Sequence, residues 1–529
     1  MFLTKTLSYN KFPFLSPLMK DYSLEKDELI PFIKEFPSLD GILNYAKTKY
    51  FPDHQRIILN RVLTKQYVGM KHYSKVSKHI ELLKETSTFT ITTGHQLCLF
   101  TGPLYFIYKI ASIINLCTQC NKKDTNSNYV PVFWMASEDH DFEEVNHFYT
   151  EKKKYSWNTK EQGGVGRMDP SKILELTNTL QKEFGLSINA QKLIQLFEDS
   201  YSFSTLSKAT QFLANELFGE HGLVVLDADD HALKTFMIPS FEQEIKQELV
   251  FKAYAETEKI WPNKYKKQVN ARLCNLFYLT NNFRGRLIKQ GLDVWTADGL
   301  DKIWSEDELI QELHSHPERF SPNVIMRPLY QEKILPNLAY IGGGGELAYW
   351  MLFKPIFEAF EIDFPFLILR KSGLVVSSKF SSQLESKQVS WEDLLLNEAD
   401  FMSNYANENY NDHGKLNEIK SLSSQLLNEI KQEFTHLEPT IEHREKEIEK
   451  TVNKLSTTLK RNWKRKQTDI KWTFRKVKEE IYPKGKLQER HLNFSTYYFL
   501  YQNKFVEAFI EKADVFDKSI LIVEEKNED

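Results

Sequence analysis

Residues 91–109, ITTGHQLCLFTGPLYFIYK, change from a β-strand pattern to a helical pattern within one short stretch. The apolar, threonine-rich start is typical of a strand, and the segment after the Gly-Pro pair is typical of an amphipathic helix. His95 and Gln96 lie at the turn, between Gly94 and Gly102. Open α/β sheets bind ligands at the carboxyl ends of their strands. The turn therefore predicts a ligand-facing site, the alternative being a histidine that only caps the helix or packs.

Short apolar runs followed by polar residues occur at four places, and helical patterns separate them. These runs are 88–94, 130–135, 222–230 and 364–376. The second run is apolar on both faces, as in a buried parallel strand. Alternating strands and helices predict an α/β fold with a doubly wound parallel sheet.

The gaps between these strands are too long for loops without structure of their own, which indicates insertions into the sheet domain. From about residue 386 apolar residues recur at spacings of three and four with charges between them, which predicts a coiled coil. Pro439 would cost about 3 kcal/mol inside a helix but can begin one. HLEPT, residues 436–440, therefore predicts a helical hairpin with arms of roughly 40 residues.

The expected domain organisation follows from these segments. It is a core over 1–149, a connecting insertion over 150–215, core over 216–249, a second connecting insertion over 250–318, core over 319–385, a coiled-coil hairpin over 386–482 and a C-terminal core segment over 483–529.

The composition indicates a folded globular protein, because 41% of the 529 residues are hydrophobic and 13% are aromatic. A net charge of −3 argues against a general nucleic-acid or membrane-surface binder. Residues 97–117 resemble a membrane span, but Lys109 near the middle would cost about 3 kcal/mol there, which favours a buried helix. No signal peptide is evident, and the four cysteines predict reduced thiols in the cytoplasm.

The acidic stretch SEDHDFEEVNH, residues 137–147, follows the second strand. If it is helical, His140, Glu144 and His147 share one face and could ligate a metal ion. A carboxylate-helix metal site would need a second Glu-x-x-His pair, and residues 137–147 contain none besides Glu144 and His147. Binding of an amine or ammonium group by carboxylates at the strand end is the preferred interpretation, and a solvated acidic turn is the remaining alternative. The candidate catalytic residues are Glu138, Asp139, His140 and Asp141.

Four glycines, residues 342–345, follow an apolar run and precede a helical one. This pattern predicts a turn that cradles a phosphate or a carboxylate, or a purely structural turn. It is not a P-loop, because the Lys-Ser/Thr pair is absent. A second candidate for a phosphate contact is Lys379 in SSKFSS, residues 377–382, for which an ordinary exposed loop is the alternative.

Four long blocks occur in order between about residues 90 and 495: TGHQLCLFTGPLYFIYK, VPVFWMASEDHDFEEVNH, RPLYQEKILPNLAYIGGGGELAYW and YPKGKLQERHLNF. With them the chain resembles, over nearly its whole length, the cysteine-adding enzymes of bacillithiol biosynthesis. The resemblance implies a Rossmann-like core similar to class I aminoacyl-tRNA synthetases, two connecting insertions, and a coiled coil that forms a homodimer. It also implies a ligase that forms an amide bond between L-cysteine and the amine of glucosaminyl-malate, with no nucleic-acid or membrane partner.

A carboxylate and an amine do not condense unaided in water, so ATP is expected although no nucleotide motif is present. The expected substrate-binding residues are Thr93, Gly94, His95, Gln96, Gly102, Tyr105, Asn146, Arg327, Tyr330, Gln331, Asn337, Tyr340, Gly343, Gly344, Glu346 and Arg370. The expected nucleotide-binding residues are Lys379, Gln488 and Arg490, and no metal ligand is expected. Lys379 or Arg327 would face phosphate or malate carboxylates, and an acidic residue would hold or deprotonate the amine. The competing hypotheses are a metal-dependent enzyme that uses His140, Glu144 and His147, and a catalytically silent coiled-coil scaffold.

Overall fold

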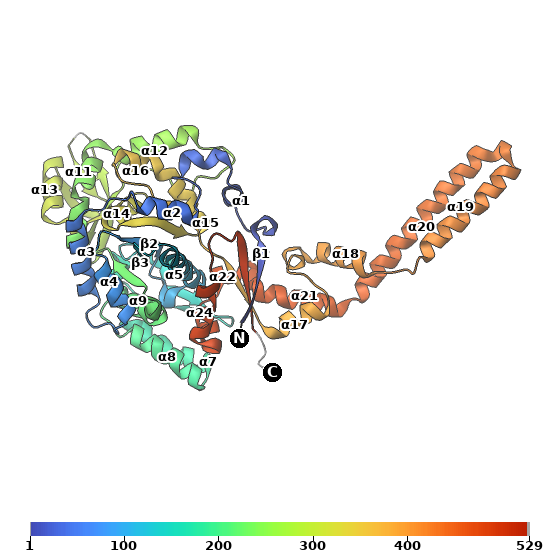
Figure 1. Ribbon diagram of the computed structural model, residues 1–529, viewed down its shortest axis with the longest axis horizontal. Coiled ribbons are helices and arrows are strands. Elements are labelled where there is room, and N and C mark those ends of the chain that lie inside the picture. The colour runs from blue at the N-terminus through green and yellow to red at the C-terminus, as the bar shows by residue number, and fades with distance from the viewer. Residues whose placement is uncertain (1, 292, 526–529) are drawn as a thin grey trace. The chain divides into compact units, whose positions relative to one another are not determined.

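A computed structural model describes residues 2–291 and 293–525 of the chain (Figure 1). The chain divides into two compact units. The larger unit comprises residues 2–374 and 486–523, and the smaller comprises residues 375–485 with residues near the chain ends.

The larger unit is built on a parallel sheet with the strand order β13-β12-β2-β3-β6. Its strands are β2 (Thr88–His95), β3 (Asn128–Met135), β6 (Val224–Asp227), β12 (Asn337–Gly342) and β13 (Phe366–Leu369). The helix α5 (Tyr105–Lys123) connects β2 to β3 and packs against both (Figure 1). The predicted α/β fold and its first three strands are confirmed.

The strand order reverses between β2 and β12. From β2 the chain continues to β3 and β6 on one side, and it returns to β12 and β13 on the other. Parallel pairing brings the carboxyl ends of β2 and β12 to the same edge, where Thr92 lies opposite Tyr340. Such a switch point is where open α/β sheets leave a crevice for ligands.

Helices cover the sheet and precede it in the sequence. They are α1 (Pro17–Ser23), α2 (Leu39–Ala46), α3 (Asp53–Gln66) and α4 (Ser74–Leu82). The helix α2 packs near β12, whereas α3 and α4 pack near β6. The strand β1 (Phe2–Ser8) precedes these helices.

Two segments extend beyond this core. The first contains α6 (Phe142–Val145), β4 (His147–Tyr149), β5 (Lys154–Ser156), α7 (Thr177–Phe184), α8 (Ile188–Ser200) and α9 (Leu206–Phe218). The second contains α10 (His231–Lys234), α11 (Ile238–Gln247), α12 (Leu249–Ile260), β7 (Leu276–Thr280), β8 (Phe283–Lys289), β9 (Trp295–Ala297), β10 (Leu300–Trp304), α13 (Glu306–Ser315) and β11 (Phe320–Pro322). Its strands form an antiparallel sheet in the order β10-β9-β8-β7-β11.

The remaining elements of the larger unit return to the core. They are α14 (Arg327–Ile334), α15 (Gly344–Trp350), α16 (Lys354–Ala359), α22 (Gln488–His491), α23 (Ser495–Tyr501), α24 (Asn503–Lys512) and β15 (Ser519–Glu525). The helix α24 packs on α5, where the rings of Phe509 and Tyr108 stack with centroids 4.1 Å apart. The run predicted over 364–376 forms two strands, β13 and β14 (Gly373–Val376), and β14 belongs to a separate sheet of order β1-β15-β14.

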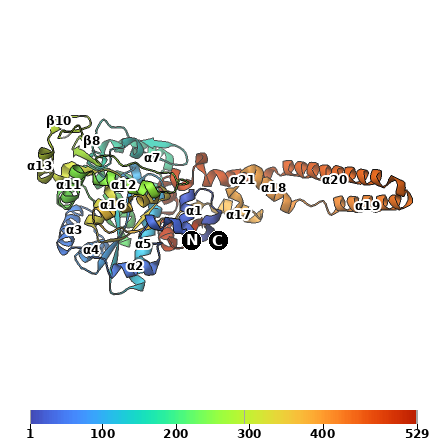
Figure 2. The ribbon, with the colours of Figure 1, turned by 90° about the horizontal axis from the view of Figure 1, so that it is seen from above.

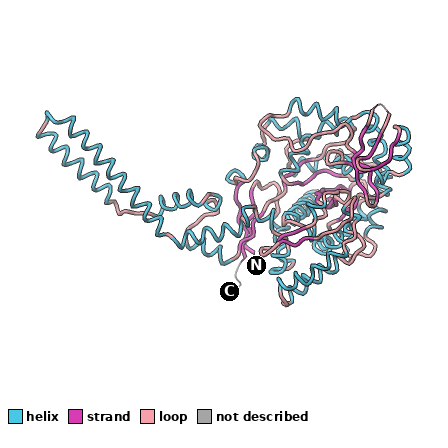
Figure 3. The backbone as a smooth tube through the Cα atoms, turned by 180° about the vertical axis from the view of Figure 1, so that it is seen from behind, coloured by secondary structure: helices cyan, strands magenta, loops and turns pink. Residues whose placement is uncertain are grey.

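The smaller unit is helical. It contains α17 (Ser378–Ser386), α18 (Glu398–Asn409), α19 (Lys415–Glu433), α20 (Glu438–Lys466) and α21 (Thr468–Ile481). Figure 2 and Figure 3 show α19 and α20 lying side by side as a hairpin, which confirms the predicted coiled coil. Pro439 lies in the first turn of α20, as predicted.

The hairpin arms are 19 and 29 residues long, shorter than expected. Gly414, with a φ of +76° in the left-handed region, lies directly before α19, so the first arm begins after it and does not continue from α18. Within residues 2–291 and 293–525, no helix combines the length and apolar character that crossing a membrane requires.

Candidate functional site

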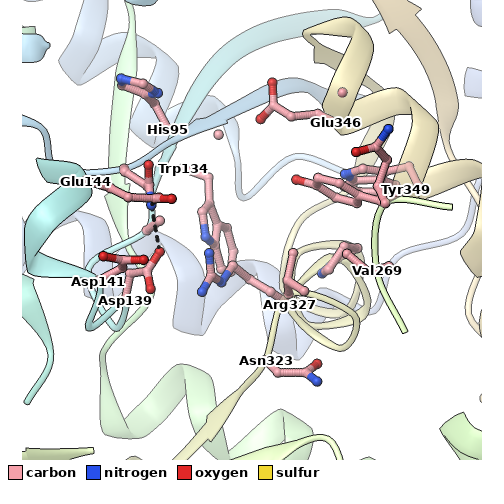
Figure 4. A pocket seen from close by; sticks show the side chains of 18 of the residues that line it. His95, Trp134, Asp139, Asp141, Glu144, Val269, Asn323, Arg327, Glu346 and Tyr349 are labelled. Atoms are coloured by element: carbon pink, nitrogen blue, oxygen red, sulfur yellow. Dashed lines mark hydrogen bonds between the residues drawn. The ribbon is translucent and has the colours of Figure 1, made fainter. Parts of the chain in front are cut away.

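A cavity of about 860 Å³ opens at the carboxyl edge of the parallel sheet (Figure 4). Its walls come from the ends of β2, β3 and β12, from the start of α14 and from the antiparallel sheet of the second inserted segment. In Figure 4, Asp139, Asp141 and Glu144 gather on one side, and Glu346 and Tyr349 lie on the other.

The cavity brings together predicted residues from distant parts of the sequence. Those that line it are Gly94, His95, Gln96, Tyr105, Asp139, His140, Asp141, Arg327, Gln331, Tyr340, Gly343, Gly344, Glu346, Arg370 and Arg490. The segments near residues 94, 139, 327 and 343 therefore converge on one site.

Several other predicted residues are not among those lining the cavity, because their side chains make structural contacts in the core. Thr93 donates to the Ile341 carbonyl at 2.7 Å, and Tyr330 donates to the Ala228 carbonyl at 2.7 Å. Asn337 accepts from Thr92 at 2.8 Å and so joins β12 to β2.

Glu138 and Asn146 also serve the structure around the cavity. Glu138 is buried and forms an ion pair with buried Lys234, which in turn donates to the Phe320 carbonyl at 2.6 Å. The carbonyl of buried Asn146 accepts from the Trp157 N–H at 2.8 Å. The prediction that Glu138 faces a ligand is corrected, because its carboxylate neutralises Lys234.

Three further predicted residues also lie outside the cavity lining. Gly102 has a φ of +67°, and a Cβ there would lie 2.5 Å from the Cys98 Cβ, so this glycine is required by the turn. Gln488 is buried in α22, and Lys379 is an exposed residue of α17 in the smaller unit.

Gln96 organises the acidic side of the cavity. Its Nε2 donates to Asp139 Oδ2 at 3.1 Å and to Glu144 Oε2 at 2.6 Å. Burial acts to raise the pKa of Asp139, but hydrogen bonds from His140 and Gln96 and the positive charge of Arg327 outweigh it, so this pKa lies well below its ordinary value. Asp139 is therefore a persistent carboxylate, suited to holding an ammonium group.

The alternative in which His140, Glu144 and His147 share one helical face is wrong. The helix α6 spans only Phe142–Val145, so His140 precedes it and His147 lies in β4. The Nδ1 of His147 lies 2.9 Å from Asn146 Oδ1, and Glu144 is bound by Gln96. Among the described residues, no group of three or more His, Cys, Asp and Glu side chains could hold a metal ion.

Arg284 of β8 fixes the proton position on His140. Its Nη1 lies 2.6 Å from His140 Nδ1, and since a guanidinium only donates, Nδ1 must accept. With Nδ1 as the acceptor, the N–H of this ring lies on Nε2. Burial and the charge of Arg327 lower the pKa of Arg284 to about 10, which still leaves it charged at neutral pH.

A network around Glu346 ties the ends of β2 and β12 together. Glu346 accepts from the Gly343 N–H at 2.8 Å and from the Tyr340 hydroxyl at 3.0 Å. Its Oε2 also lies 2.7 Å from Nζ of Lys109, which donates to the Gly94 carbonyl at 2.7 Å. Burial lowers the pKa of Lys109, and the charge of Glu346 opposes this shift.

His95 and Arg370 contribute buried polar atoms to the cavity wall. Burial, together with the positive charge of Lys109, lowers the pKa of His95 well below its ordinary value, so the ring is neutral. Arg370 makes a two-pronged ion pair with Glu489, at 2.7 and 2.9 Å. Within the described residues, His95 Nε2 and Arg370 Nε are buried without a hydrogen-bond partner.

The sequence did not predict several lining residues as ligand contacts. They include Lys109, Trp134, Arg284, Arg286, Asn323 and Tyr349. The available signal was the alternation in FRGRLIK, residues 283–289, which places Arg284 and Arg286 on one face of a strand.

Comparison with known proteins agrees with this architecture. Residues 3–371 match the family model described as Bacillithiol biosynthesis BshC, N-terminal Rossmann-like domain, and residues 373–525 match the C-terminal coiled-coil domain of the same family.

Each of the following relatives is named "Putative cysteine ligase BshC". The Flavobacterium johnsoniae protein is 45% identical over 396 residues, 74% of each chain. The Christiangramia forsetii protein is 36% identical over 532 residues, 98% of this chain and 99% of the relative. The Cytophaga hutchinsonii protein is 34% identical over 488 residues, 91% of each chain. The chain therefore belongs to the BshC family of bacillithiol biosynthesis, whose members are named as cysteine ligases.

Proposed function

We propose that the protein joins the carboxyl group of L-cysteine to the amine of glucosaminyl-malate, using ATP. The observation that carries this proposal is that one cavity is lined by several carboxylates and by several guanidinium groups. Asp139, Asp141 and Glu144 suit amine and ammonium groups, and Arg284, Arg286 and Arg327 suit anions.

Amide formation requires activation, because a carboxylate repels the attacking amine and hydroxide is a poor leaving group. ATP would supply a phosphate-bearing leaving group in place of hydroxide. His95 Nε2 and Arg370 Nε, buried without partners among the described residues, are polar atoms available to such a ligand. Of the three residues predicted for the nucleotide, Arg490 lines the cavity.

The attacking amine must be neutral, so a base has to accept its proton. Asp139 is a weak base because of its low pKa, and it better holds the ammonium of cysteine. His140 cannot take up a proton at Nδ1, because this nitrogen already accepts a hydrogen bond from Arg284. The base is therefore Asp141 or Glu144, both exposed carboxylates that line the cavity.

The test is a reconstituted reaction of the purified protein with L-cysteine, glucosaminyl-malate and ATP, followed by mass spectrometry of the thiol product. We expect product with all three components and none when ATP is omitted. An undiminished rate without ATP would contradict the role of the nucleotide. Absence of product under every condition would contradict the ligase assignment.

We propose further that the coiled-coil hairpin forms a homodimer. Leu422 and Leu426 of α19 are 52% and 56% exposed, and Leu455 of α20 is 44% exposed. These leucines repeat at the spacing of a coiled-coil seam, so a second copy of the hairpin would remove them from water.

We place the reaction in the cytoplasm. The four cysteines of the chain all lie in its described part, and each is free and buried. Free thiols suit a reducing compartment, and a thiol substrate would also remain reduced there.

A further inference from the structure

The cavity wall formed by the second inserted segment carries two arginines on one strand. Arg284 and Arg286 are two residues apart in β8, so their side chains point to the same face, and both line the cavity. Arg327, at the first turn of α14, reaches the same cavity (Figure 4).

These arginines differ in how many of their donors are used. Arg284 is anchored: its guanidinium donates to Ser321 Oγ at 3.2 Å, to the Pro322 carbonyl at 3.3 Å and to His140. It also lies 3.8 Å above the ring of Phe277. Over residues 2–291 and 293–525, no hydrogen bond or ion pair engages the guanidinium of Arg286 or of Arg327.

The positive charge of the three arginines on this wall favours binding of an anion. Burial and the positive charge of Arg327 lower the pKa of Arg284, and the carboxylates of Asp139 and Glu138 oppose this effect. Two free guanidinium forks on separate elements match two carboxylates better than one, because each planar fork binds one carboxylate through two parallel hydrogen bonds.

We propose that Arg286 and Arg327 each bind one carboxylate of a dicarboxylate group, with Arg284 as a fixed charge beside them. This inference rests on the proposed function, in which the dicarboxylate is the malyl end of the acceptor. The amine of the glucosaminyl group is on the carbon next to the one that bears malate, so binding of the malyl group at the arginines would hold this amine in the same cavity as Asp139, Asp141 and Glu144. The second inserted segment therefore selects the acceptor.

The first experiment needs no variant. Binding of L-malate, L-lactate and inorganic phosphate to the full-length protein is measured by calorimetry at fixed ionic strength. We expect malate to bind about tenfold or more tightly than lactate, which lacks one carboxylate, since one charge-assisted contact changes affinity by roughly ten- to hundredfold. Equal affinity for malate and lactate would overturn the proposal. Tighter binding of phosphate than of malate would assign the wall to a nucleotide instead.

The second experiment compares variants. Arg286→Gln should weaken malate binding by about tenfold or more and leave lactate binding less affected, and Arg286→Lys should restore part of the loss. The matched control is Arg61→Gln, which removes an exposed arginine of α3 that does not line the cavity. Unchanged malate affinity in Arg286→Gln would refute the assignment.

The same variants separate the inference from the function on which it rests. If the wild-type protein forms product and Arg286→Gln keeps its KM for glucosaminyl-malate, the dicarboxylate site is wrong and the ligase function stands. If the wild-type protein binds malate through Arg286 but forms no product, the ligase function is wrong and the dicarboxylate site stands.

Discussion

At the scale of single residues, two neighbouring acidic residues of one turn have different roles. Glu138 and Asp139 are neighbours in sequence, yet Glu138 pairs with Lys234 in the core and Asp139 faces the cavity. Sequence polarity at a strand end indicated both residues. It could not tell which side chain would be used to neutralise a buried lysine.

The role of Asp139 can be tested by Asp139→Asn, which keeps the shape and removes the charge. We expect kcat/KM for L-cysteine to fall by roughly ten- to hundredfold, because hydrogen bonds to charged groups contribute about 1.5–3 kcal/mol. Steady-state kinetics with varied cysteine measures this. Asp301→Asn, at an exposed position of β10 that does not line the cavity, is the control. Wild-type kinetics in the Asp139→Asn enzyme would show that Asp139 has no role in binding cysteine.

Glu332 gives the fold a pH dependence. Burial raises the pKa of its carboxyl to about 7, although Lys49 and hydrogen bonds from Gln331 and Asn337 oppose the shift. A folded-state pKa above the unfolded one stabilises the fold most at low pH, and this stability is lost as the pH rises through about 7.

The corresponding variant is Glu332→Gln. Between pH 5 and pH 8, the wild type should lose about 2–3 kcal/mol of unfolding free energy that the variant does not lose. Urea unfolding at the two pH values measures the difference. Parallel pH profiles of the two proteins would show that Glu332 does not titrate in this range.

At the scale of secondary-structure elements, apolar runs predicted β2, β3 and β6 because these strands are buried on both faces. The central strand β12 was missed as a strand, because Asn337 begins it and the following glycines indicated a turn. Asn337 is tolerated there because Thr90, Thr92 and Glu332 satisfy its amide. Such a network spans 247 residues of sequence and leaves no local pattern.

The coiled-coil hairpin was predictable because its repeat is local. Its exposed leucines give a test of the homodimer through Leu422→Glu combined with Leu426→Glu in α19. We expect the double variant to be a monomer by light scattering, since two buried charges would oppose association. The control, Asn417→Glu, places a charge at an exposed polar position of the same helix. If the double variant remains dimeric, the dimer interface does not include these leucines.

At the scale of the whole molecule, predicted site residues from distant segments line one cavity, because the parallel strands that carry them end at the same edge of the sheet. The sequence did not predict that the second inserted segment would form a wall of the same cavity, because a strand such as FRGRLIK looks like an ordinary half-exposed strand. Nor did it predict that 364–376 would divide at Arg370 and Lys371, whose buried charges pair with Glu489 and Asp517.

These pairs tie the segment that contains α22 and β15 to the core, and Glu489→Gln tests their importance. We expect a loss of about 3–5 kcal/mol of unfolding free energy, because Arg370 would remain charged and buried. Denaturant unfolding followed by tryptophan fluorescence measures it. The matched control is Glu398→Gln, which breaks the exposed two-pronged pair with Arg475, and should cost less than about 1 kcal/mol. Equal losses in the two variants would mean that burial adds nothing to the Arg370–Glu489 pair.

The sheet of order β1-β15-β14 has a consequence for biosynthesis. β15 is translated after every other strand of the structure, yet it lies between β1 and β14. While a ribosome is still extending the chain, β1 and β14 each expose an edge with unpaired N–H and C=O groups. The protein thus acquires its finished form only after β15 has left the exit tunnel, and until then the nascent chain offers two open edges to chaperones or to neighbouring nascent chains.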